Sequence, residues 1–261
     1  MKYAKKSLGQ NFLIDKNIKK KIVSLVNINN KNVVEIGPGK GSLTDEIIKK
    51  KPKTLILIEK DNYLYEFLKD KYNKNKNIII FNKDILKFNL EKQLKKDTII
   101  FGNLPYNISS QILIKIIKLK GQPSKFDSLI FMFQKELAER IYGKFGTRTY
   151  GRLSILANFK LKIVNKFFVS KNCFFPKPKI ESAVLHFKKK EKISHNIKKI
   201  ENLEKITNIL FSNRRKMINK NIKKIFKDKN VGFFKNLNLN SRPSDLKPDK
   251  YYEITEIFER N

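Results

Sequence analysis

The 261-residue sequence has few of the residues that form disulfides, metal centres or membrane spans. It contains one cysteine, Cys173, no tryptophan, and two histidines, His186 and His195. A single cysteine excludes an internal disulfide, and its spacing from the histidines fits no usual zinc site. The longest apolar runs, such as 55–58 and 78–81, are too short to cross a bilayer. We therefore expect no bound metal and no transmembrane helix.

Acidic residues are also scarce, with 24 Asp and Glu against 58 Lys and Arg, and the formal net charge is +34. Such a surplus attracts polyanions and predicts a nucleic-acid partner whose binding weakens with salt. Part of the excess has another explanation, because an AT-rich genome favours codons for Lys, Asn and Ile. Lysines also interrupt the N-terminal segment, which has no apolar stretch like that of a secretory signal. We expect a cytoplasmic protein.

Short β-branched runs alternate with amphipathic segments through the first half of the chain. The runs span 32–36, 54–58, 78–81, 98–101 and 128–133, and the amphipathic segments span 42–51, 63–72 and 109–119. This alternation predicts a doubly wound α/β domain with a mostly parallel sheet. Two further extended segments, 159–169 and 180–187, flank Pro176 and Pro178 and are expected to form an antiparallel pair at a sheet edge.

The pattern changes after residue 188 to a charged stretch followed by helical periodicity. Apolar residues then recur three or four positions apart, at Ile200, Leu203, Ile206, Leu210, Ile218, Ile222 and Ile225. This spacing predicts a small C-terminal helical domain. We place the boundary near residue 190, which gives domains of 1–190 and 191–261.

A glycine-rich turn follows the first predicted strand and precedes a helix, with the sequence Glu-Ile-Gly-Pro-Gly-Lys-Gly over residues 35–41. Gly37, Gly39 and Gly41 have the spacing G-x-G-x-G, which differs from the G-x-G-x-x-G of dinucleotide sites. S-adenosylmethionine has no phosphate and carries an ammonium and a sulfonium, so the preceding carboxylate of Glu35 suits it better. A generic tight turn is the alternative, and the loop alone favours a nucleoside cofactor only modestly.

Acidic residues stand at the ends of the next two predicted strands. Glu59, followed by Lys60, lies about 20 residues after the loop, where a carboxylate accepts ribose hydroxyls. Asp84 is placed to accept from the adenine amine, and Ile85 to pack against the ring. Asp84 fits the N-cap of a helix equally well when taken alone. Glycine, Glu and Asp at three successive strand ends nevertheless favour a cofactor site.

The fourth strand leads into the most specific pattern in the chain, Asn103-Leu104-Pro105-Tyr106. An adenine amine is a poor nucleophile because its lone pair is delocalised into the ring. The Asn103 side-chain oxygen and the Leu104 carbonyl can accept its two N–H groups, Pro105 fixes the turn, and Tyr106 can stack on the base. A plain strand-ending turn is the alternative. The pattern predicts methyl transfer to an exocyclic adenine amine without a strong general base.

These segments together resemble the ribosomal RNA small-subunit adenine dimethyltransferase family. The resemblance runs nearly end to end and rests on the segments 8–13, 35–41, 103–106, 150–154, 174–179 and 211–216. It implies a Rossmann-like class I methyltransferase domain, with the helical domain recognising RNA. It also implies S-adenosyl-L-methionine as cofactor, with contacts at Asn11, Leu13, Gly37, Glu59, Asp84 and Asn103.

The same resemblance implies a substrate and a product. The expected substrate is a pair of adjacent adenosines in a hairpin of small-subunit ribosomal RNA, either naked or in an immature small ribosomal subunit. The expected product is N6,N6-dimethyladenosine, with a role in ribosome biogenesis. We expect a monomer, because nothing in the sequence indicates an obligate interface.

Further residues are candidates for contacts with RNA. Phe174 is a candidate for the second face of a base stacked on Tyr106, and a core position is the even alternative. Basic residues at five positions are candidates for phosphate contacts, or else belong to a solvated basic face. They are Lys177, Lys179, Arg214, Arg215 and Lys216.

Three other functions compete with this interpretation. One is a noncatalytic RNA-binding assembly or transcription factor, which the intact 103–106 segment disfavours. Another is methylation of large-subunit ribosomal RNA, which the C-terminal helices and residues 174–179 disfavour by resemblance. The third is methylation of adenine in DNA, which would use the same chemistry.

Overall fold

The computed structural model describes residues 11–119, 126–226 and 237–260, so residues 8–10 of the predicted N-terminal motif lie outside the described part. The chain forms two compact units. The first comprises Met1–Ala138 with Lys162–Lys189, and the second Glu139–Leu161 with Lys190–Asn261. Residues 139–161, assigned from the sequence to the first domain, thus belong to the second unit. No described helix is both long and apolar enough to span a membrane.

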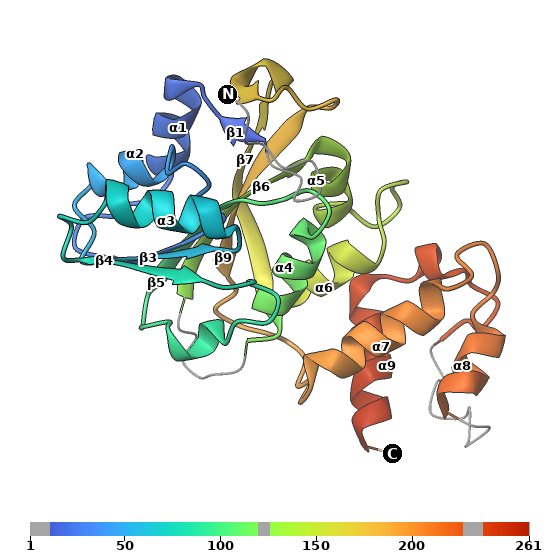
Figure 1. Ribbon diagram of the computed structural model, residues 1–261. Coiled ribbons are helices and arrows are strands. Elements are labelled where there is room, and N and C mark those ends of the chain that lie inside the picture. Colours follow the sequence, from blue (N-terminus) through green and yellow to red (C-terminus); the bar gives the residue numbers. More distant parts are fainter. Residues whose placement is uncertain (1–10, 120–125, 227–236, 261) are drawn as a thin grey trace. The chain divides into compact units, whose positions relative to one another are not determined.

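A seven-stranded sheet forms the centre of the first unit (Figure 1). Its order is β4-β3-β2-β5-β6-β9-β7. The strands are β2 (Asn32–Ile36), β3 (Thr54–Glu59), β4 (Ile78–Asn82), β5 (Thr98–Asn103), β6 (Phe126–Gln134), β7 (Leu161–Val169) and β9 (Ser182–Lys189). The five strands β4, β3, β2, β5 and β6 run parallel to one another, and β9 is antiparallel to β6. Strands β3 and β4 are added on one side of β2, and β5 and β6 on the other, which places a topological switch point between β2 and β5.

Helices connect three successive pairs of parallel strands, as the alternating pattern predicted. They are α2 (Thr44–Ile48), α3 (Asn62–Lys71) and α4 (Ser109–Ile117), while α1 (Lys16–Val23) precedes β2 and α5 (Lys135–Ile141) follows β6. Asp15 caps α1 by accepting from the Ile18 amide, and Asp61 caps α3 by accepting from the Tyr63 and Leu64 amides. Figure 1 shows α1, α2 and α3 grouped on one side of the strands. Short 3-10 turns occur at η2 (Leu90–Lys92) and η3 (Lys171–Cys173).

The core beneath these helices is built from alternate residues of the strands. Val33, Leu55, Leu57, Ile99 and Phe101 point to this side and pack with buried apolar residues of α1, α2 and α3. The residues between them on each strand face the opposite side, because side chains alternate along a strand. Both faces are buried, which explains the continuous apolar runs in the sequence.

A separate two-stranded sheet joins the start of the described chain to the segment before β9. It pairs β1 (Phe12–Leu13) with β8 (Phe174–Phe175) in antiparallel register, Leu13 opposite Phe174 and Phe12 opposite Phe175. The amide of Ile14 also donates to the Cys173 carbonyl at 2.8 Å. This pairing holds the N-terminal segment beside the first unit's sheet.

The second unit is helical. It contains α6 (Arg152–Lys160), α7 (Ile200–Phe211), α8 (Asn219–Phe226), η5 (Pro243–Asp245) and α9 (Pro248–Arg260). Tyr150 donates its hydroxyl to the Leu246 carbonyl at 2.8 Å, and Tyr252 donates to the Ile155 carbonyl at 3.0 Å. Both tyrosines are buried, so these bonds tie residues 139–161 to the C-terminal helices. This long-range packing explains why the sequence pattern alone gave a different division.

The elements agree closely with the sequence pattern where periodicity is strong. β2 has the predicted bounds, and β3 and β5 extend beyond their predicted carboxyl ends to include Glu59 and Asn103. Residues 159–160, predicted as strand, end α6 instead. Helices α1, α5, α6 and α9 were not predicted from the sequence. The predicted pair at the sheet edge is present as neighbouring strands β9 and β7.

Candidate active site

One pocket lies at the carboxyl ends of β2, β3, β4 and β5 in the first unit, with residues of β1 at its side. This is the position at which open α/β sheets bind ligands, outside the strand ends beside the switch point. Its lining includes most of the residues predicted for a cofactor and a reacting base. They are Asn11, Leu13, Glu35, Gly37, Gly39, Glu59, Lys60, Asp84, Ile85, Asn103, Leu104, Pro105 and Tyr106.

Two glycines of the loop after β2 have backbone conformations that favour glycine. Gly37 has a φ of +67° and Gly39 a φ of +60°. A Cβ atom on Gly39 would come within 2.9 Å of the Phe12 ring. The absence of side chains therefore lets the loop bend sharply and lets Phe12 approach the backbone at the pocket wall.

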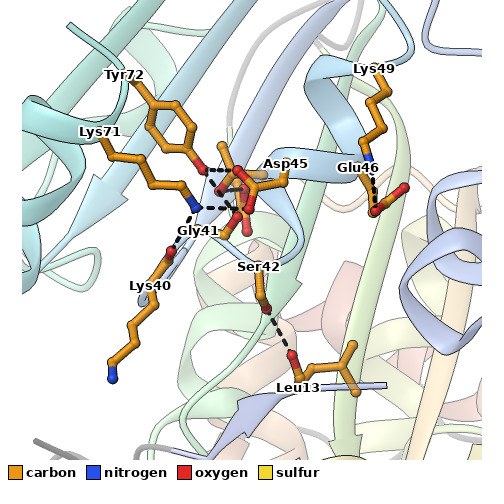
Figure 2. Close-up of polar contacts among 11 residues, drawn as sticks. Leu13, Lys40, Gly41, Ser42, Asp45, Glu46, Lys49, Lys71 and Tyr72 are labelled. Carbon is orange, nitrogen blue, oxygen red and sulfur yellow. Dashed lines mark hydrogen bonds and ion pairs between the residues drawn. The ribbon is translucent and has the colours of Figure 1, made fainter. Parts of the chain in front are cut away.

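Gly41 has a different role from the one predicted, because it does not line the pocket. Its φ is +76°, its carbonyl accepts from the Tyr72 hydroxyl at 3.0 Å, and a Cβ there would lie 2.2 Å from that oxygen. Figure 2 shows Lys71, the last residue of α3, and Tyr72, its C-cap, pointing at this segment. Tyr72 also donates to Asp45 at 2.7 Å, and Lys71 contacts Asp45 at 2.7 Å and the Lys40 carbonyl at 3.2 Å. Gly41 is thus a fixed support of the cofactor loop.

Glu35 is almost fully buried at the end of β2, with 2% of its surface exposed. Thr44, at the start of α2, donates its hydroxyl to Glu35 Oε2 at 2.6 Å. Burial raises the pKa of Glu35 to about 8, although the Thr44 hydrogen bond opposes the shift. A carboxyl group of this kind gains its charge readily when a cation approaches, which suits the ammonium or sulfonium of the predicted cofactor.

Glu59 ends β3, and its carboxylate accepts hydrogen bonds from the backbone of the glycine loop and of the segment that follows β3. Its Oε2 accepts from the Gly39 amide at 3.1 Å, and its Oε1 accepts from the Asp61 amide at 2.9 Å. Burial raises the pKa of this carboxyl group, while these amides lower it. Two carboxylate oxygens together offer about four lone pairs, so acceptor capacity toward a ribose hydroxyl is left after the bonds from the Gly39, Lys60 and Asp61 amides. The bond to Gly39 was not predicted, and it makes Glu59 a support of the glycine loop as well.

Asp84 follows β4 and begins a turn rather than a helix. Its Oδ1 accepts from the Leu86 amide at 2.9 Å within this turn, and its Oδ2 lies 2.8 Å from Lys60 Nζ. The Lys60 ammonium keeps the pKa of Asp84 below its usual value, so the group is ionised and able to accept. Ile85, which is buried, supplies an apolar wall beside it. Lys60 therefore acts on the pocket through Asp84.

Asn103 is the last residue of β5, and its side chain is held by the N-terminal segment. Its Nδ2 donates to the Asn11 backbone carbonyl at 3.0 Å. This contact uses the donor end of the amide and turns the acceptor, Oδ1, to the other side. Leu104 and Pro105 follow in the pocket wall. The arrangement can accept a hydrogen bond from an exocyclic amine, as predicted from the sequence.

Tyr106 lines the same pocket, and its hydroxyl lies 2.6 Å from the Ser182 Oγ of β9. Ser182 is fully buried, and burial raises the pKa of the Tyr106 phenol. The phenol is therefore neutral at physiological pH and contributes an aromatic face rather than a base. Ser182 carried no signal in the sequence, because an isolated serine at the start of a strand is common.

Phe174 lies in the hydrophobic core rather than in the pocket. Only 3% of its surface is exposed, and it packs in the same cluster as Leu13, its partner across the β1–β8 pair. The neighbouring Phe175 is 47% exposed, since successive strand residues face opposite ways. The core position is the alternative that the sequence left open for Phe174.

The predicted phosphate-binding residues are all exposed, and none of them lines the pocket. Lys177 and Lys179 follow β8 in the first unit. Arg214, Arg215 and Lys216 follow α7 in the second unit, where Arg214 Nη2 donates to the Arg148 and Tyr150 carbonyls at 2.9 and 3.0 Å. Arg214 is thus partly engaged in holding the helical unit together, a role that the sequence did not predict.

The sheet order and the pocket have the form of a class I methyltransferase. The fold is similar to that of a dimethyladenosine transferase from Plasmodium falciparum, with a TM-score of 0.74 and 24% identity over 95% of this chain and 98% of that one. It is also similar to the 23S rRNA methyltransferase ErmE, with a TM-score of 0.66 and 20% identity over 95% of this chain and 100% of that one. At these identities the likeness concerns the fold alone.

Sequence comparison gives the family. A model described as ribosomal RNA adenine dimethylase matches residues 1–260, and the chain belongs to this family of S-adenosylmethionine-dependent enzymes. A ribosomal RNA small subunit methyltransferase A from Pelagibacter ubique is 48% identical, over 98% of this chain and 97% of that protein. A protein of the same description from Malacoplasma penetrans is 40% identical, over 98% and 92%.

Proposed function

We propose that this protein transfers methyl groups from S-adenosylmethionine to the N6 amine of two adjacent adenosines in a hairpin of small-subunit ribosomal RNA. The full-length similarity to proteins described as small subunit methyltransferases supports the choice of RNA. The net charge of +34 suits a polyanionic substrate. The product is N6,N6-dimethyladenosine, and the role is in ribosome biogenesis.

The residues of the pocket fit the cofactor. When bound, S-adenosylmethionine supplies an electrophilic methyl group on a sulfonium. Gly37 and Gly39 leave room for close backbone approach, and the Glu59 carboxylate, already oriented by backbone amides, has acceptor capacity for a ribose hydroxyl. Asp84 is ionised for the adenine amine, and Glu35 supplies a carboxyl group for the cationic end.

The orientation of the Asn103 amide is the observation that carries the proposal. Because Nδ2 is held by the Asn11 carbonyl, Oδ1 is the end that can accept an N–H from the target amine. The Leu104 carbonyl accepts the second N–H, so the nitrogen lone pair is turned toward the methyl donor. Tyr106 holds the base by stacking. Alignment and electrostatic support thus replace a strong general base.

The basic residues outside the pocket are proposed to bind the RNA backbone. Lys177, Lys179, Arg215 and Lys216 are exposed, and Arg214 is held at one nitrogen with other N–H groups left to donate. Contacts of this kind position the RNA and weaken with salt. We further propose that the protein acts in the cytoplasm as a monomer, on immature small ribosomal subunits.

Transfer of labelled methyl from S-adenosylmethionine to unmodified small ribosomal subunits tests the proposal. Nucleoside analysis of the RNA is expected to find N6,N6-dimethyladenosine. Large ribosomal subunits and duplex DNA, assayed in parallel, test the two competing methyl acceptors. Absence of transfer to any of these substrates, in a protein that binds both cofactor and RNA, would favour the noncatalytic assembly factor.

A further inference from the structure

We propose that Ser182 is a positioning residue for methyl transfer, because it fixes the position of the Tyr106 ring against which the target base stacks. The inference rests on the proposed function and assigns a role to a residue outside the pocket lining. It is carried by the 2.6 Å contact between Tyr106 Oη and Ser182 Oγ.

Ser182 is a rigid anchor for this contact. It is the first residue of β9, lies opposite Gln134 of β6 in the sheet, and is fully buried. The preceding residue, Glu181, accepts at its carbonyl from the Lys135 amide at 3.0 Å, and its carboxylate pairs with Lys135 Nζ at 2.9 Å. The backbone on both sides of Ser182 is therefore held to β6 and the start of α5.

Tyr106 depends on such an anchor because it lies beyond the end of β5. Its own turn is held by local bonds, from the Ile108 amide to the Pro105 carbonyl at 3.1 Å and from the Ser109 hydroxyl to the Tyr106 carbonyl at 3.2 Å. These bonds fix the backbone and leave two side-chain torsions undetermined. The hydroxyl oxygen is the far end of the side chain and lies on the axis of the second torsion. A bond there therefore fixes the first torsion, and with it the position of the ring.

Loss of the contact between Ser182 and Tyr106 is expected to affect the methyl-transfer step rather than cofactor binding. A base stacked on a displaced ring presents its amine away from the line of transfer, and small misalignments of reacting atoms are costly. The cofactor contacts at Gly39, Glu59 and Asp84 come from other strands and do not involve Ser182. Loss of the Ser182 hydroxyl is thus expected to lower kcat while leaving the Kd for S-adenosylmethionine unchanged.

The test is a double-mutant cycle of Ser182→Ala and Tyr106→Phe, assayed by methyl transfer to unmodified small ribosomal subunits. Each single variant removes one end of the same bond, so each is expected to lower kcat about tenfold. In the Tyr106→Phe background, Ser182→Ala is expected to cause no further loss. Ser182→Thr keeps a hydroxyl and is expected to recover part of the activity.

Ser128→Ala is the matched control. Ser128 is also fully buried in the central sheet, and its hydroxyl bonds to Asp127 at 2.6 Å and His186 at 3.2 Å, away from the pocket lining. It is expected to lower the Tm without lowering kcat. An RNA hairpin with 2-aminopurine at the target position gives a second readout, since stacking quenches its fluorescence and Ser182→Ala is expected to reduce the quenching.

Additive losses in the cycle, or equal losses of kcat in Ser182→Ala and Ser128→Ala, would overturn the inference. Wild-type activity in a folded Ser182→Ala variant would overturn it as well. If the wild-type protein itself transfers no methyl group, the proposed function has failed instead. The two failures are therefore separate outcomes of one set of assays.

Discussion

The two halves of the pocket are held together in different ways. The half proposed to bind the cofactor, here the cofactor half, lies at the ends of β2 and β3 and is supported by contacts between residues up to 31 positions apart. Glu59 binds amides 20 and 2 positions away, and Thr44 binds Glu35 at a separation of 9. The half proposed to act on the base, here the catalytic half, follows β5 and is held by contacts over much longer separations. Asn103 is bound to a residue 92 positions away.

The two halves also differ in how many contacts hold each residue in place. The glycine loop is held at several atoms by Glu59, Tyr72 and Lys71, so loss of one contact leaves others in place. Asn103 and Tyr106 are each oriented by one side-chain bond to a distant segment, at Asn11 and Ser182. Changes in the catalytic half are therefore expected to act on turnover, and changes in the cofactor half on cofactor affinity and stability.

The largest effect is expected from Asn103→Ala. The change removes the acceptor for the target amine, and kcat is expected to fall about 100- to 1000-fold, as when one preorganised polar group is removed from other active sites. Cofactor binding should be partly retained, because the contacts of the cofactor half remain. Single-turnover methyl transfer and calorimetry measure the two quantities. Asn172→Ala, an exposed site, is the control, and normal turnover in Asn103→Ala would contradict the assigned role.

The next effect is a pH dependence of folding stability that arises from Glu35. Its pKa is about 8 in the folded chain against an ordinary value of 4.5, so the native state binds more protons than the unfolded state between these values. Stability therefore falls as pH rises through this interval. Glu35→Gln mimics the protonated form and should remove a loss on the order of 3 kcal/mol. Urea unfolding from pH 5 to 9 measures it, and an unchanged slope in the variant would refute the assignment.

A smaller effect is expected for Glu59→Ala. It removes the proposed ribose acceptor and the bond to the Gly39 amide, so the Kd for S-adenosylmethionine should rise roughly 10- to 100-fold. Affinity for RNA should change much less. Calorimetry with cofactor and filter binding with RNA make the comparison, with Glu66→Ala on the exposed side of α3 as control. Normal cofactor affinity would show that the end of β3 is wrongly assigned.

The smallest effect concerns the support behind the loop. Gly41→Ala places a methyl group 2.2 Å from the Tyr72 hydroxyl at a φ of +76°, and should cost about 2 kcal/mol of stability. Gly146→Ala is the matched control, because Gly146 has a φ of +81° with open space around its Cβ position. It should lose only about 1 kcal/mol. Thermal unfolding measures both, and adding Tyr72→Phe should relieve part of the Gly41→Ala loss. Equal losses at the two glycines would show that the hydroxyl contact is unimportant.

The strands and the local parts of the site could be predicted because their signals are short-range. Alternation of apolar runs and amphipathic segments gave the parallel sheet, and polar residues at successive strand ends gave Glu59, Asp84 and Asn103. Gly41 shows the limit of this reasoning. Its place in the glycine pattern was evident, but its contact with Tyr72 depends on where the C-terminal end of α3 lies relative to the loop before α2.

The residues that sequence reasoning placed least well depend on pairing between distant segments. Phe174 had two possible environments, and the register of β8 against β1 places it beside Leu13 in the core. Ser182 had no distinguishing neighbour in the sequence. Residues 139–161 belong to the helical unit because Tyr150 and Tyr252 form buried bonds within it.

The sequence by itself therefore determined the sheet, the residue types that gather at the ends of its strands and the chemistry available to the 103–106 segment. These follow from the periodicity of apolar residues and from residue types that stand next to one another in the chain. Only the tertiary structure decided which atoms of those residues remain available. Asn103 presents Oδ1 because Asn11 holds its Nδ2, and Tyr106 presents its ring because Ser182 holds its hydroxyl. Such contacts join segments 92 and 76 residues apart, and their pairing depends on the packing of the whole unit.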